Sequence, residues 1–332
     1  MSRSLVLGDG GWGTALALSL RRAGRAVTVW SVDSVYAAEV ARSRENRKFL
    51  PGVPIPPEIL WTADTEAALR AADEFYAVVP TQYLRATLAR FGGRLAALPA
   101  VSAAKGLELH TFQRPSEILA AVAGTRRVAV LSGPSHAEEV GRGLATTVVV
   151  AASDPALAAQ TQERLSSESF RVYTSDDPVG VELGGALKNI IAVAAGVSDG
   201  LGLGDNAKAA LVARGLMEMA RFGEGLGARR DTFFGLSGAG DLMVTCYSRH
   251  SRNRALGERI GRGETLAHIL AGTETVAEGV WTCQAVGEQA RRLGVDMPIT
   301  QQLHAILFEG LEPRRAVREL MLRPARAELD HA

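Results

Sequence analysis

Hydrophobic and polar positions in the first half of the chain alternate between short β-rich runs and longer stretches of helical periodicity. The β-rich runs fall at residues 4–8, 26–30, 75–80, 97–104, 127–133 and 144–153, and helical stretches follow at 12–24, 34–44, 81–92 and 155–167. Such alternation predicts an α/β fold, a mostly parallel sheet with helices on both faces. The proline-rich segment 50–59 is predicted to be a surface loop.

The pattern changes after the polar stretch "SFRVYTSDDP" at 169–178. From Val179 onward nearly every segment has helical periodicity, interrupted by the glycine-rich turns "DGLGLGD" and "GLSGAGD". This pattern predicts an all-helical second domain. We place the boundary near residue 178, which gives a first domain over 1–178 and a second over 179–332.

Length and charge narrow the class of protein. A chain of 332 residues is longer than a single hydrophobic core usually serves, so its length predicts about two domains. Its net charge of +1 gives no reason to expect nucleic acid or an anionic membrane as a partner. The two cysteines, Cys246 and Cys283, have neither metal-site spacing nor a disulfide framework, so no metal is expected.

Neither a signal peptide nor a membrane span is expected. The chain enters "SLVLGDGGWG" directly, and we find no apolar run that reaches the roughly 18 residues of a membrane span. We therefore expect a cytoplasmic protein.

The segment "GDGGWG" places Gly8, Gly10 and Gly13 in a G-x-G-x-x-G pattern between the first strand and the first helix. In that context the first glycine permits a tight turn, and the second lets the backbone approach a pyrophosphate. The third allows the helix to pack closely on the sheet. A Rossmann-like, doubly wound first domain that binds a dinucleotide is predicted; a glycine-rich turn without a ligand is the alternative.

Lysine is rare in this chain. Only four of the 37 basic residues are lysines, namely Lys48, Lys105, Lys188 and Lys208. An amine can lose its proton, whereas a guanidinium stays charged, so a lysine kept in apolar sequence is a candidate for proton transfer. Lys188 lies in "GGALKNIIAVAAG", which we place one or two turns into the first helix of the second domain, facing the interdomain cleft.

The other three lysines are weaker candidates. Lys105 follows a predicted strand in "SAAKGLE" and is a second candidate for the site. Lys48 is interpreted as a surface residue, and Lys208 could be either. Structural alternatives are an ordinary loop lysine for Lys105 and, for Lys188, a side chain that extends from a helix end.

A second polar group lies in the segment 235–257. Asp241 follows a glycine-rich turn, and Ser251, Arg252 and Asn253 form a compact run of hydrogen-bond donors. A forked guanidinium flanked by hydroxyl and amide suits a phosphate. The alternative is a capped helix start with a surface arginine.

These segments together resemble the NAD(P)-dependent glycerol-3-phosphate dehydrogenases. "GDGGWGTALA", "SAAKGLE", "LSGPSHAEEV", "GVELGGALKNIIAVAAG", "GLSGAGDLMVTC" and "SRNRALG" occur in the order found in that family. The similarity runs from Leu5 to about Met297, and the segments around Lys188 and Asp241 are specific to the family.

The resemblance implies reversible reduction of dihydroxyacetone phosphate to glycerol 3-phosphate with NADH or NADPH, in support of glycerophospholipid synthesis. It also implies a cytoplasmic homodimer with small-molecule substrates. Catalytic positions implied are Lys188, the proton donor and acceptor, with Lys105, Asn189 and Asp241. Substrate contacts implied are Lys105, Gly133, Ser135, Lys188, Asp241, Ser251, Arg252 and Asn253.

Cofactor contacts are expected at the glycine turn and around it. The glycine motif predicts contacts at Gly8, Gly10 and Gly13. The resemblance implies further contacts at Gly11, Trp12, Val32, Ala137, Val276 and Glu278, and Ser31, Lys105 and Arg252 are also expected to contact the cofactor.

The chemistry of the residues agrees with this reaction. Reducing a ketone develops negative charge on its oxygen, which a protonated Lys188 would stabilise and then protonate. Lys105 would lower the pKa of Lys188, and Asp241 would orient it. Arg252 would anchor the phosphate.

The end of the second predicted strand decides cofactor preference. It carries Ser31, whose hydroxyl suits either ribose, and Val32, which suits neither; Asp33 comes late. Arg42, Arg44 and Arg47 could reach this point and tilt the site mildly toward NADPH. We predict that both cofactors are used.

Two other functions compete with this assignment. A β-hydroxyacid dehydrogenase or ketopantoate-type reductase shares the domain layout and a helix lysine but lacks the "GAGDL…SRN" segment. A non-catalytic dinucleotide-sensing protein would keep the glycines and need neither Lys188 nor Asp241.

Overall fold

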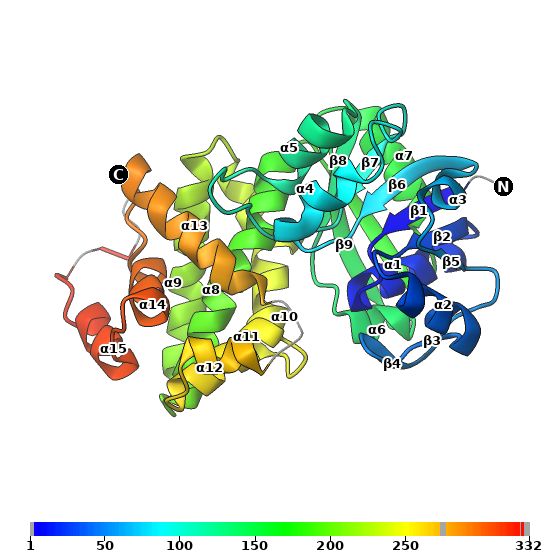
Figure 1. The fold of residues 1–332 in the computed structure, drawn as a ribbon. Helices are drawn as coiled ribbons and strands as arrows, with labels where there is room; N and C mark the ends of the chain where they lie inside the picture. The colour runs from blue at the N-terminus through cyan, green and yellow to red at the C-terminus, as the bar shows by residue number, and fades with distance from the viewer. Residues whose placement is uncertain (1–2, 273–276, 326, 329–332) are drawn as a thin grey trace.

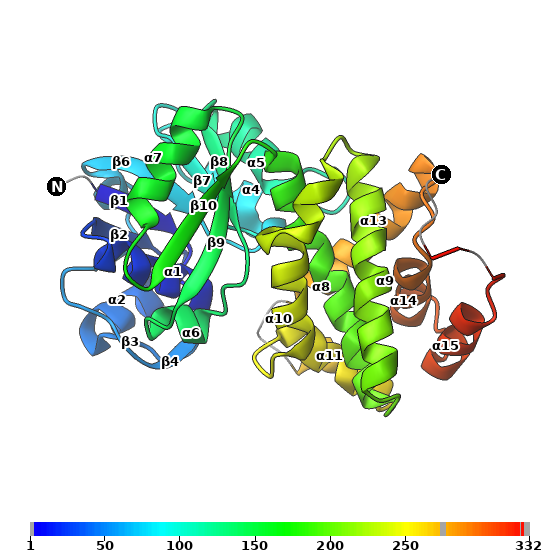
Figure 2. The ribbon, with the colours of Figure 1, turned by 180° about the vertical axis from the view of Figure 1, so that it is seen from behind.

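The computed structural model describes residues 3–272, 277–325 and 327–328, which form two bodies side by side. An α/β body at the N-terminal end and a helical body at the C-terminal end are joined by the long helix α8, Pro178–Gly200, which starts beside the sheet (Figure 1; Figure 2). Each body has its own main apolar clusters, one among the helices around α8 and one on each face of the sheet. A smaller cluster joins the two, since Val181 of α8 packs with Val130, Val149 and Ala151 of the sheet.

The strands of the main sheet are short. They are β1 Arg3–Leu7, β2 Ala26–Trp30, β5 Leu60–Thr62, β6 Ala72–Ala77, β7 Ala100–Ser102, β8 Val128–Ser132, β9 Thr146–Ala151 and β10 Phe170–Ser175. The inner strands are mostly buried, whereas the edge strands β5 and β10 are partly exposed. Two further strands, β3 Glu45–Asn46 and β4 Leu50–Pro54, pair antiparallel in a small ribbon.

The main sheet has the order β10-β9-β8-β7-β6-β1-β2-β5 within the described residues. Its neighbouring strands are parallel, except that β8 and β9 are antiparallel. Burial on both faces explains the continuous apolar runs of β1 and β6. Because β1, β2, β6, β7 and β8 are parallel, their carboxyl ends lie at one edge of the sheet. The strand order reverses at β1, and such folds bind ligands at the carboxyl edge beside this point.

Helices cover both faces of the sheet. In the first body they are α1 Gly11–Arg22, α2 Ser34–Ser43, α3 Thr65–Leu69, α4 Thr81–Ala89, α5 Pro115–Ile118, α6 Ala137–Gly141 and α7 Pro155–Leu165, with a π-helical turn at Leu119–Ala123. Asp33, Asp64 and Asp154 cap the starts of α2, α3 and α7 by accepting backbone N–H groups.

The second body consists of helices in the described residues. After α8 come α9 Asp205–Glu224, α10 Asp241–Tyr247, α11 Arg252–Gly261, α12 Leu266–Ala271, α13 Glu278–Leu293, α14 Pro298–Phe308 and α15 Pro313–Met321. A 3₁₀ turn at Arg230–Phe234 and a π-helical turn at Leu236–Gly240 lead into α10. The predicted Rossmann-like sheet followed by a helical domain is therefore confirmed.

Helix α8 passes through the middle of the second body. It is long and apolar enough to cross a membrane by length and composition alone, but 94% of its apolar window is buried inside the protein. Our expectation that no apolar run reaches that length overlooked α8. Its glycines let other helices approach closely, because a Cβ at Gly196 would lie 2.0 Å from the carbonyl oxygen of Arg254 on α11.

One part of the predicted secondary structure is wrong. The proline-rich segment 50–59, expected to be a surface loop, contains strand β4 and buries Leu50, Val53, Ile55 and Ile59. The proline Pro54 lies on a two-stranded ribbon, where a missing N–H is tolerated. The prolines of the segment 50–59 suggested a loop, but its apolar side chains pack into the cluster on one face of the sheet, beside α1 and α6.

Candidate active site

The glycine turn between β1 and α1 has the geometry of a dinucleotide cradle. Gly8 has φ +117°, where a side chain is strained, and a Cβ there would lie 2.9 Å from the carbonyl oxygen of Val78. A Cβ on Gly13 would lie 2.1 Å from the carbonyl oxygen of Gly8. Gly10 differs, since nothing lies within 4 Å of its would-be Cβ, so a ligand has room to approach this backbone at the start of α1.

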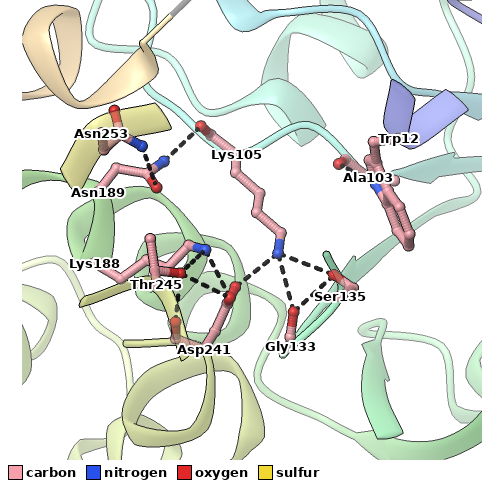
Figure 3. A network of polar contacts seen from close by, with 10 residues as sticks. All are labelled: Trp12, Ala103, Lys105, Gly133, Ser135, Lys188, Asn189, Asp241, Thr245 and Asn253. Atoms are coloured by element: carbon pink, nitrogen blue, oxygen red, sulfur yellow. Dashed lines mark hydrogen bonds and ion pairs between the residues drawn. The ribbon is translucent and has the colours of Figure 1, made fainter. Parts of the chain in front are cut away.

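The ribbon and α6 form walls around this turn. A Cβ on Gly11 would meet the carbonyl oxygen of Phe49 at 2.5 Å and the Cβ of Ala137 at 3.6 Å. Trp12 donates its indole N–H to the carbonyl oxygen of Ala103, 3.2 Å away, which fixes the ring between the turn and the segment after β7 (Figure 3). Phe49, which directly precedes the segment 50–59 interpreted as a loop, was not predicted as a site residue.

The end of β2 differs from the arrangement that the sequence led us to expect. Ser31 is fully buried and donates its hydroxyl to a carboxylate oxygen of Asp9, 2.5 Å away, so this side chain is not presented to a ligand. Val32 is 56% exposed, so its side chain is open to solvent at the end of β2. The carboxylate of Asp33 accepts the N–H groups of Val35 and Tyr36 and so caps α2.

The arginines invoked for NADPH lie on and after the last turn of α2. Arg44 donates to the carbonyl oxygen of Ile59 at 3.1 Å, and Arg47 pairs with Glu45 at 3.1 Å. Arg42 is exposed in the last turn of α2, the end away from the capped start beside Val32. Because Arg44 and Arg47 already have partners within the protein, we no longer expect these two side chains to favour NADPH over NADH.

Two lysines meet one buried carboxylate at the centre of the site (Figure 3). Lys188 on α8 donates to one oxygen of Asp241 at 2.6 Å, and Lys105 after β7 donates to the other at 2.7 Å. Asp241 is the first residue of α10 and is 1% exposed. The network therefore joins the sheet edge to two helices of the second body.

The backbone around Lys188 explains why it reaches this carboxylate. Lys188 is the eleventh residue of α8, about three turns in, rather than one or two as expected. One turn earlier, Gly184 and Gly185 carry no side chain, and a Cβ on Gly185 would lie 2.5 Å from the hydroxyl of Ser132 on β8. Small residues thus let α8 lie against the end of β8, which brings Lys188 to the sheet edge.

One N–H group of the Lys188 ammonium has no hydrogen-bond acceptor among the described residues. The acceptors of this ammonium are the Asp241 carboxylate and the hydroxyl of Thr245, each 2.6 Å away, whereas an ammonium has three N–H groups. Thr245 in turn donates to the carbonyl oxygen of Asp241 at 2.6 Å. Thr245 was not predicted as a site residue, although its place one helical turn after Asp241 could have indicated it.

Burial dominates the proton affinity of Lys188. Desolvation lowers its pKa to about 8, the Asp241 carboxylate opposes this, and the positive charge of Lys105 adds to it. We expected Lys105 to cause the shift, but burial is the larger cause. Burial by itself would raise the pKa of Asp241, but the ammonium groups of Lys105 and Lys188 outweigh it and hold that pKa below its usual value.

Every N–H group of the Lys105 ammonium has an acceptor, unlike those of Lys188. The three acceptors of Lys105 are the Asp241 carboxylate, the carbonyl oxygen of Gly133 at 3.0 Å and the hydroxyl of Ser135 at 3.2 Å. Gly133 has φ +132°, which turns the chain at the end of β8 so that its carbonyl faces Lys105. Gly133 and Ser135, expected to contact substrate, thus hold Lys105 in this structure.

Asn189 and Asn253 form a separate polar chain. Asn253 donates its amide to the side-chain oxygen of Asn189 at 2.9 Å and accepts the N–H of Gly279 at 3.0 Å. Asn189 donates to the carbonyl oxygen of Lys105 at 3.4 Å. Asn189 therefore points away from the ammonium of Lys188 and ties α8 to the segment after β7, α11 and α13 (Figure 3).

Ser251 and Arg252 begin α11 and differ in their exposure. Ser251 is buried and accepts the N–H of Arg254 at 3.2 Å, the helix cap that we kept as an alternative. Arg252 is exposed, and its positive charge acts on the carboxylate of Glu278. Arg252 is therefore placed to receive an anion, whereas the hydroxyl of Ser251 already has a partner.

Glu278 is a buried carboxylate at the first position of α13. One oxygen accepts the N–H of Thr81 at 2.8 Å, at the start of α4, and the other is buried with no hydrogen-bond partner among the described groups. Burial raises its pKa to about 7. Such an unpaired oxygen is costly unless a ligand pairs with it. Val276, also expected to contact the cofactor, lies outside the described residues.

The remaining lysines and the cysteines lie outside this network. Lys208 on α9 is buried and pairs with Asp199 at 2.8 Å, which also accepts from Arg254, so its contacts are those of a structural ion pair. Cys246 and Cys283 are both buried and unbridged. In the part of the chain that the structure describes, no group of His, Cys, Asp and Glu is placed to hold a metal.

Family comparisons cover nearly the whole chain. Residues 5–158 match the family described as NAD-dependent glycerol-3-phosphate dehydrogenase N-terminus, and residues 177–318 match the C-terminus of the same family. A relative from Pelotomaculum thermopropionicum named glycerol-3-phosphate dehydrogenase, NAD(P)+, is 49% identical over 98% of this chain and 94% of its own length. One of the same name from Carboxydothermus hydrogenoformans is 48% identical over 98% of each.

A solved structure agrees with the sequence comparisons. The crystal structure of glycerol-3-phosphate dehydrogenase from Coxiella burnetii superposes with a TM-score of 0.92 at 38% identity, covering 97% of this chain and 99% of that one. The similarity therefore includes both bodies and their relative placement.

Proposed function

Because this chain belongs to the NAD(P)-dependent glycerol-3-phosphate dehydrogenase family, we propose that Lys188 exchanges the proton in the family's reaction. The chain is an oxidoreductase that interconverts dihydroxyacetone phosphate and glycerol 3-phosphate with NADH or NADPH. The observation that carries the proposal is the buried Lys188 ammonium, which has an N–H group to spare at the carboxyl edge of the sheet.

Lys188 would act as general acid in one direction and general base in the other. As the ketone is reduced, its oxygen gains negative charge, and an ammonium donor in a buried site stabilises that charge before giving up a proton. In the oxidation, the neutral amine takes the proton of the hydroxyl group. When bound, the nicotinamide cofactor supplies or accepts the hydride.

Asp241 and Lys105 would set the position and charge of Lys188. Asp241 directs the ammonium through a 2.6 Å bond, and Thr245 supplies the second fixed contact. Lys105 neutralises the other oxygen of Asp241, so the carboxylate cannot simply remove the proton from Lys188. Two cations around one carboxylate give the network a net positive charge, which would stabilise the developing oxyanion.

The residues around the glycine turn fit a nicotinamide dinucleotide. Open space at Gly10 and the start of α1 would take the pyrophosphate, and Trp12, Phe49 and Ala137 would wall the site. The unpaired buried oxygen of Glu278 would accept an amide N–H, such as that of the nicotinamide carboxamide.

One assay tests the activity. Oxidation of NADH and NADPH would be followed with dihydroxyacetone phosphate, with ketones derived from β-hydroxyacids, and with no substrate. We expect turnover with dihydroxyacetone phosphate; turnover confined to hydroxyacid-derived ketones would contradict the proposal.

The pH dependence should differ in sign between the two directions. Reduction needs the ammonium of Lys188, whose pKa is about 8, so kcat/KM for dihydroxyacetone phosphate should fall as pH rises through that value. Oxidation needs the neutral amine, so kcat/KM for glycerol 3-phosphate should rise over the same interval. Initial rates from about pH 6.5 to about pH 10 measure both. Flat profiles in both directions would contradict the role.

Arg252→Ala should chiefly raise the KM for dihydroxyacetone phosphate. Arg252 is exposed at the start of α11 and would pair with the phosphate through charge-assisted bonds worth about 1.5–3 kcal/mol each, a factor of about ten or more. Steady-state kinetics measure KM and kcat separately. Arg249→Ala removes an exposed guanidinium from the same loop and is the control.

Dihydroxyacetone without its phosphate should be a very poor substrate of the unaltered enzyme. Equal activity on both ketones, or equal effects of the two arginine variants, would place the phosphate elsewhere.

Both reduced cofactors should support turnover, with kcat/KM values that differ by less than about a hundredfold, or about 2.7 kcal/mol. Val32 is exposed where the ribose would lie, so Val32→Arg should shift the ratio toward NADPH by adding a cation. The ratio would be measured on both proteins side by side. A preference for NADH above a thousandfold in the unaltered enzyme would exclude dual use.

Three broader expectations remain part of the proposal. The dinucleotide-binding domain would span 1–178 and the helical catalytic domain 179–332. The protein would act in the cytoplasm as a homodimer, without a nucleic-acid partner, and would supply glycerophospholipid synthesis. Analytical ultracentrifugation measures the oligomeric state, and a purely monomeric protein would contradict that part.

A further inference from the structure

The end of β2 lacks the acid that dinucleotide-binding folds commonly place there. In such folds an Asp or Glu about 20 residues after the glycine motif binds the ribose hydroxyls of the adenosine half. Here that point carries Ser31, which is fully buried, and Val32, which has no polar atom in its side chain. Asp33 follows, but one oxygen of its carboxylate accepts the backbone N–H groups of Val35 and Tyr36, which fixes this side chain at the start of α2.

Another carboxylate reaches the same point from the glycine turn. Asp9, between Gly8 and Gly10, lies close enough to β2 for the hydroxyl of Ser31 to donate to its Oδ2 at 2.5 Å. The backbone oxygen of Asp9 accepts the side-chain amide of Asn46 at 2.7 Å. The first contact holds the carboxylate of Asp9 at the end of β2, and the second holds its backbone against β3.

The carboxylate of Asp9 keeps an acceptor available. Only Oδ2 has a hydrogen-bond donor among the described residues, and no Lys or Arg of the described part forms an ion pair with it. Asp9 is partly exposed, unlike Ser31 beneath it. Its negative charge also reaches the hydroxyl of Tyr36, whose ring stands on α2 beside this point.

We infer that Asp9, positioned by Ser31, takes the place of the missing acid and selects against a 2′-phosphate on the adenosine ribose. An ionised carboxylate accepts hydrogen bonds from a ribose diol but repels a phosphate, and no described cation pairs with it to offset that charge. Asp9 is thus a specificity-determining residue that makes NADH the better of the two cofactors, within the range of dual use. The inference rests on the proposed function for the identity of the ligand.

Nucleotide binding and turnover test this inference together. Calorimetric dissociation constants would be measured for AMP and for adenosine 2′,5′-bisphosphate, neither of which needs a reaction. The ratio of kcat/KM for NADPH over NADH would be measured in parallel. Asp9→Asn keeps the shape and removes the charge, and Asp9→Ser serves if that protein does not fold.

Asp33→Asn is the matched control. It removes the same charge two residues after Ser31, and asparagine caps a helix as well as aspartate does. We expect Asp9→Asn to shift both ratios toward the 2′-phosphate by more than about fivefold and Asp33→Asn to shift them by less. A smaller shift in Asp9→Asn, or equal shifts in the two variants, would overturn the inference.

The two failures are distinguishable. If the binding ratio shifts but dihydroxyacetone phosphate is not turned over by the unaltered protein, the proposed reaction fails and Asp9 keeps its role in nucleotide selection. If turnover is normal and neither ratio shifts, the inference about Asp9 alone is wrong.

Discussion

Lys188→Met should lower kcat by about 10²–10⁴ in both directions, because it removes the general acid and base. Methionine fills a similar volume in the apolar core around α8, so the fold and cofactor affinity should change little. Lys188→Arg should be nearly as damaging, since a guanidinium keeps its proton. Single-turnover rates with NADH and dihydroxyacetone phosphate measure the chemical step.

Lys208→Met is the matched control for this prediction. Lys208 and Lys188 are both 6% exposed, and each pairs with one carboxylate, but Lys208 lies away from the sheet edge and binds Asp199. The control should lose stability while it keeps most of its turnover. Turnover of Lys188→Arg at the level of the unaltered enzyme would show that no proton passes through this side chain.

Asp241→Asn should reduce both catalysis and stability. It leaves the two ammonium groups of Lys105 and Lys188 near each other without the carboxylate that joins them. Breaking a buried ion pair on one side costs about 3–5 kcal/mol of unfolding free energy. The pKa of Lys188 should fall further, because burial and Lys105 lower it and the lost carboxylate was the largest cause that opposed them.

The measurements are the denaturation midpoint and the pH profile of ketone reduction, whose fall should move to lower pH. Asp199→Asn removes a carboxylate that joins two other cations, Lys208 and Arg254, and should reduce stability without moving the pH profile. An unmoved profile in Asp241→Asn would show that Asp241 does not govern the protonation of Lys188.

The features that depend only on residues close together in the sequence could be predicted from the sequence. The G-x-G-x-x-G turn could be predicted because its main requirements are local: Gly8 has a positive φ, Gly13 meets the backbone of Gly8, and Gly10 needs open space. The contact of Gly8 with the backbone of Val78 is long-range and was not predicted. The helical second half followed from periodicity, which is also local. The segment 50–59 failed because its prolines are turn residues in most contexts, while its burial depends on α1 and α6.

Long-range contacts decided what each site residue does. Lys188 and Asp241 are 53 residues apart, Lys105 and Asp241 are 136 apart, and Glu278 and Thr81 are 197 apart. No spacing rule along the chain predicts such pairs, because they depend on how distant elements pack. Helix α8 lies against β8 and α10 at the lysines, and α13 meets the start of α4 at Glu278. Hence the saturation of Lys105 by Gly133 and Ser135, and the unpaired oxygen of Glu278, were visible only in three dimensions.

The sequence by itself determined that this protein has a dinucleotide-binding sheet, a helical second half and an amine where most cations are arginines. Those features follow from backbone sterics, periodicity and the acid–base chemistry of single side chains. Asp241 was already expected to orient Lys188, but the tertiary structure decided which polar groups surround the other site residues: Gly133 and Ser135 hold Lys105, and Ser31 binds Asp9 at the end of β2. Burial and packing between distant segments set those pairings, because they determine which polar groups lose water and must find partners within the protein.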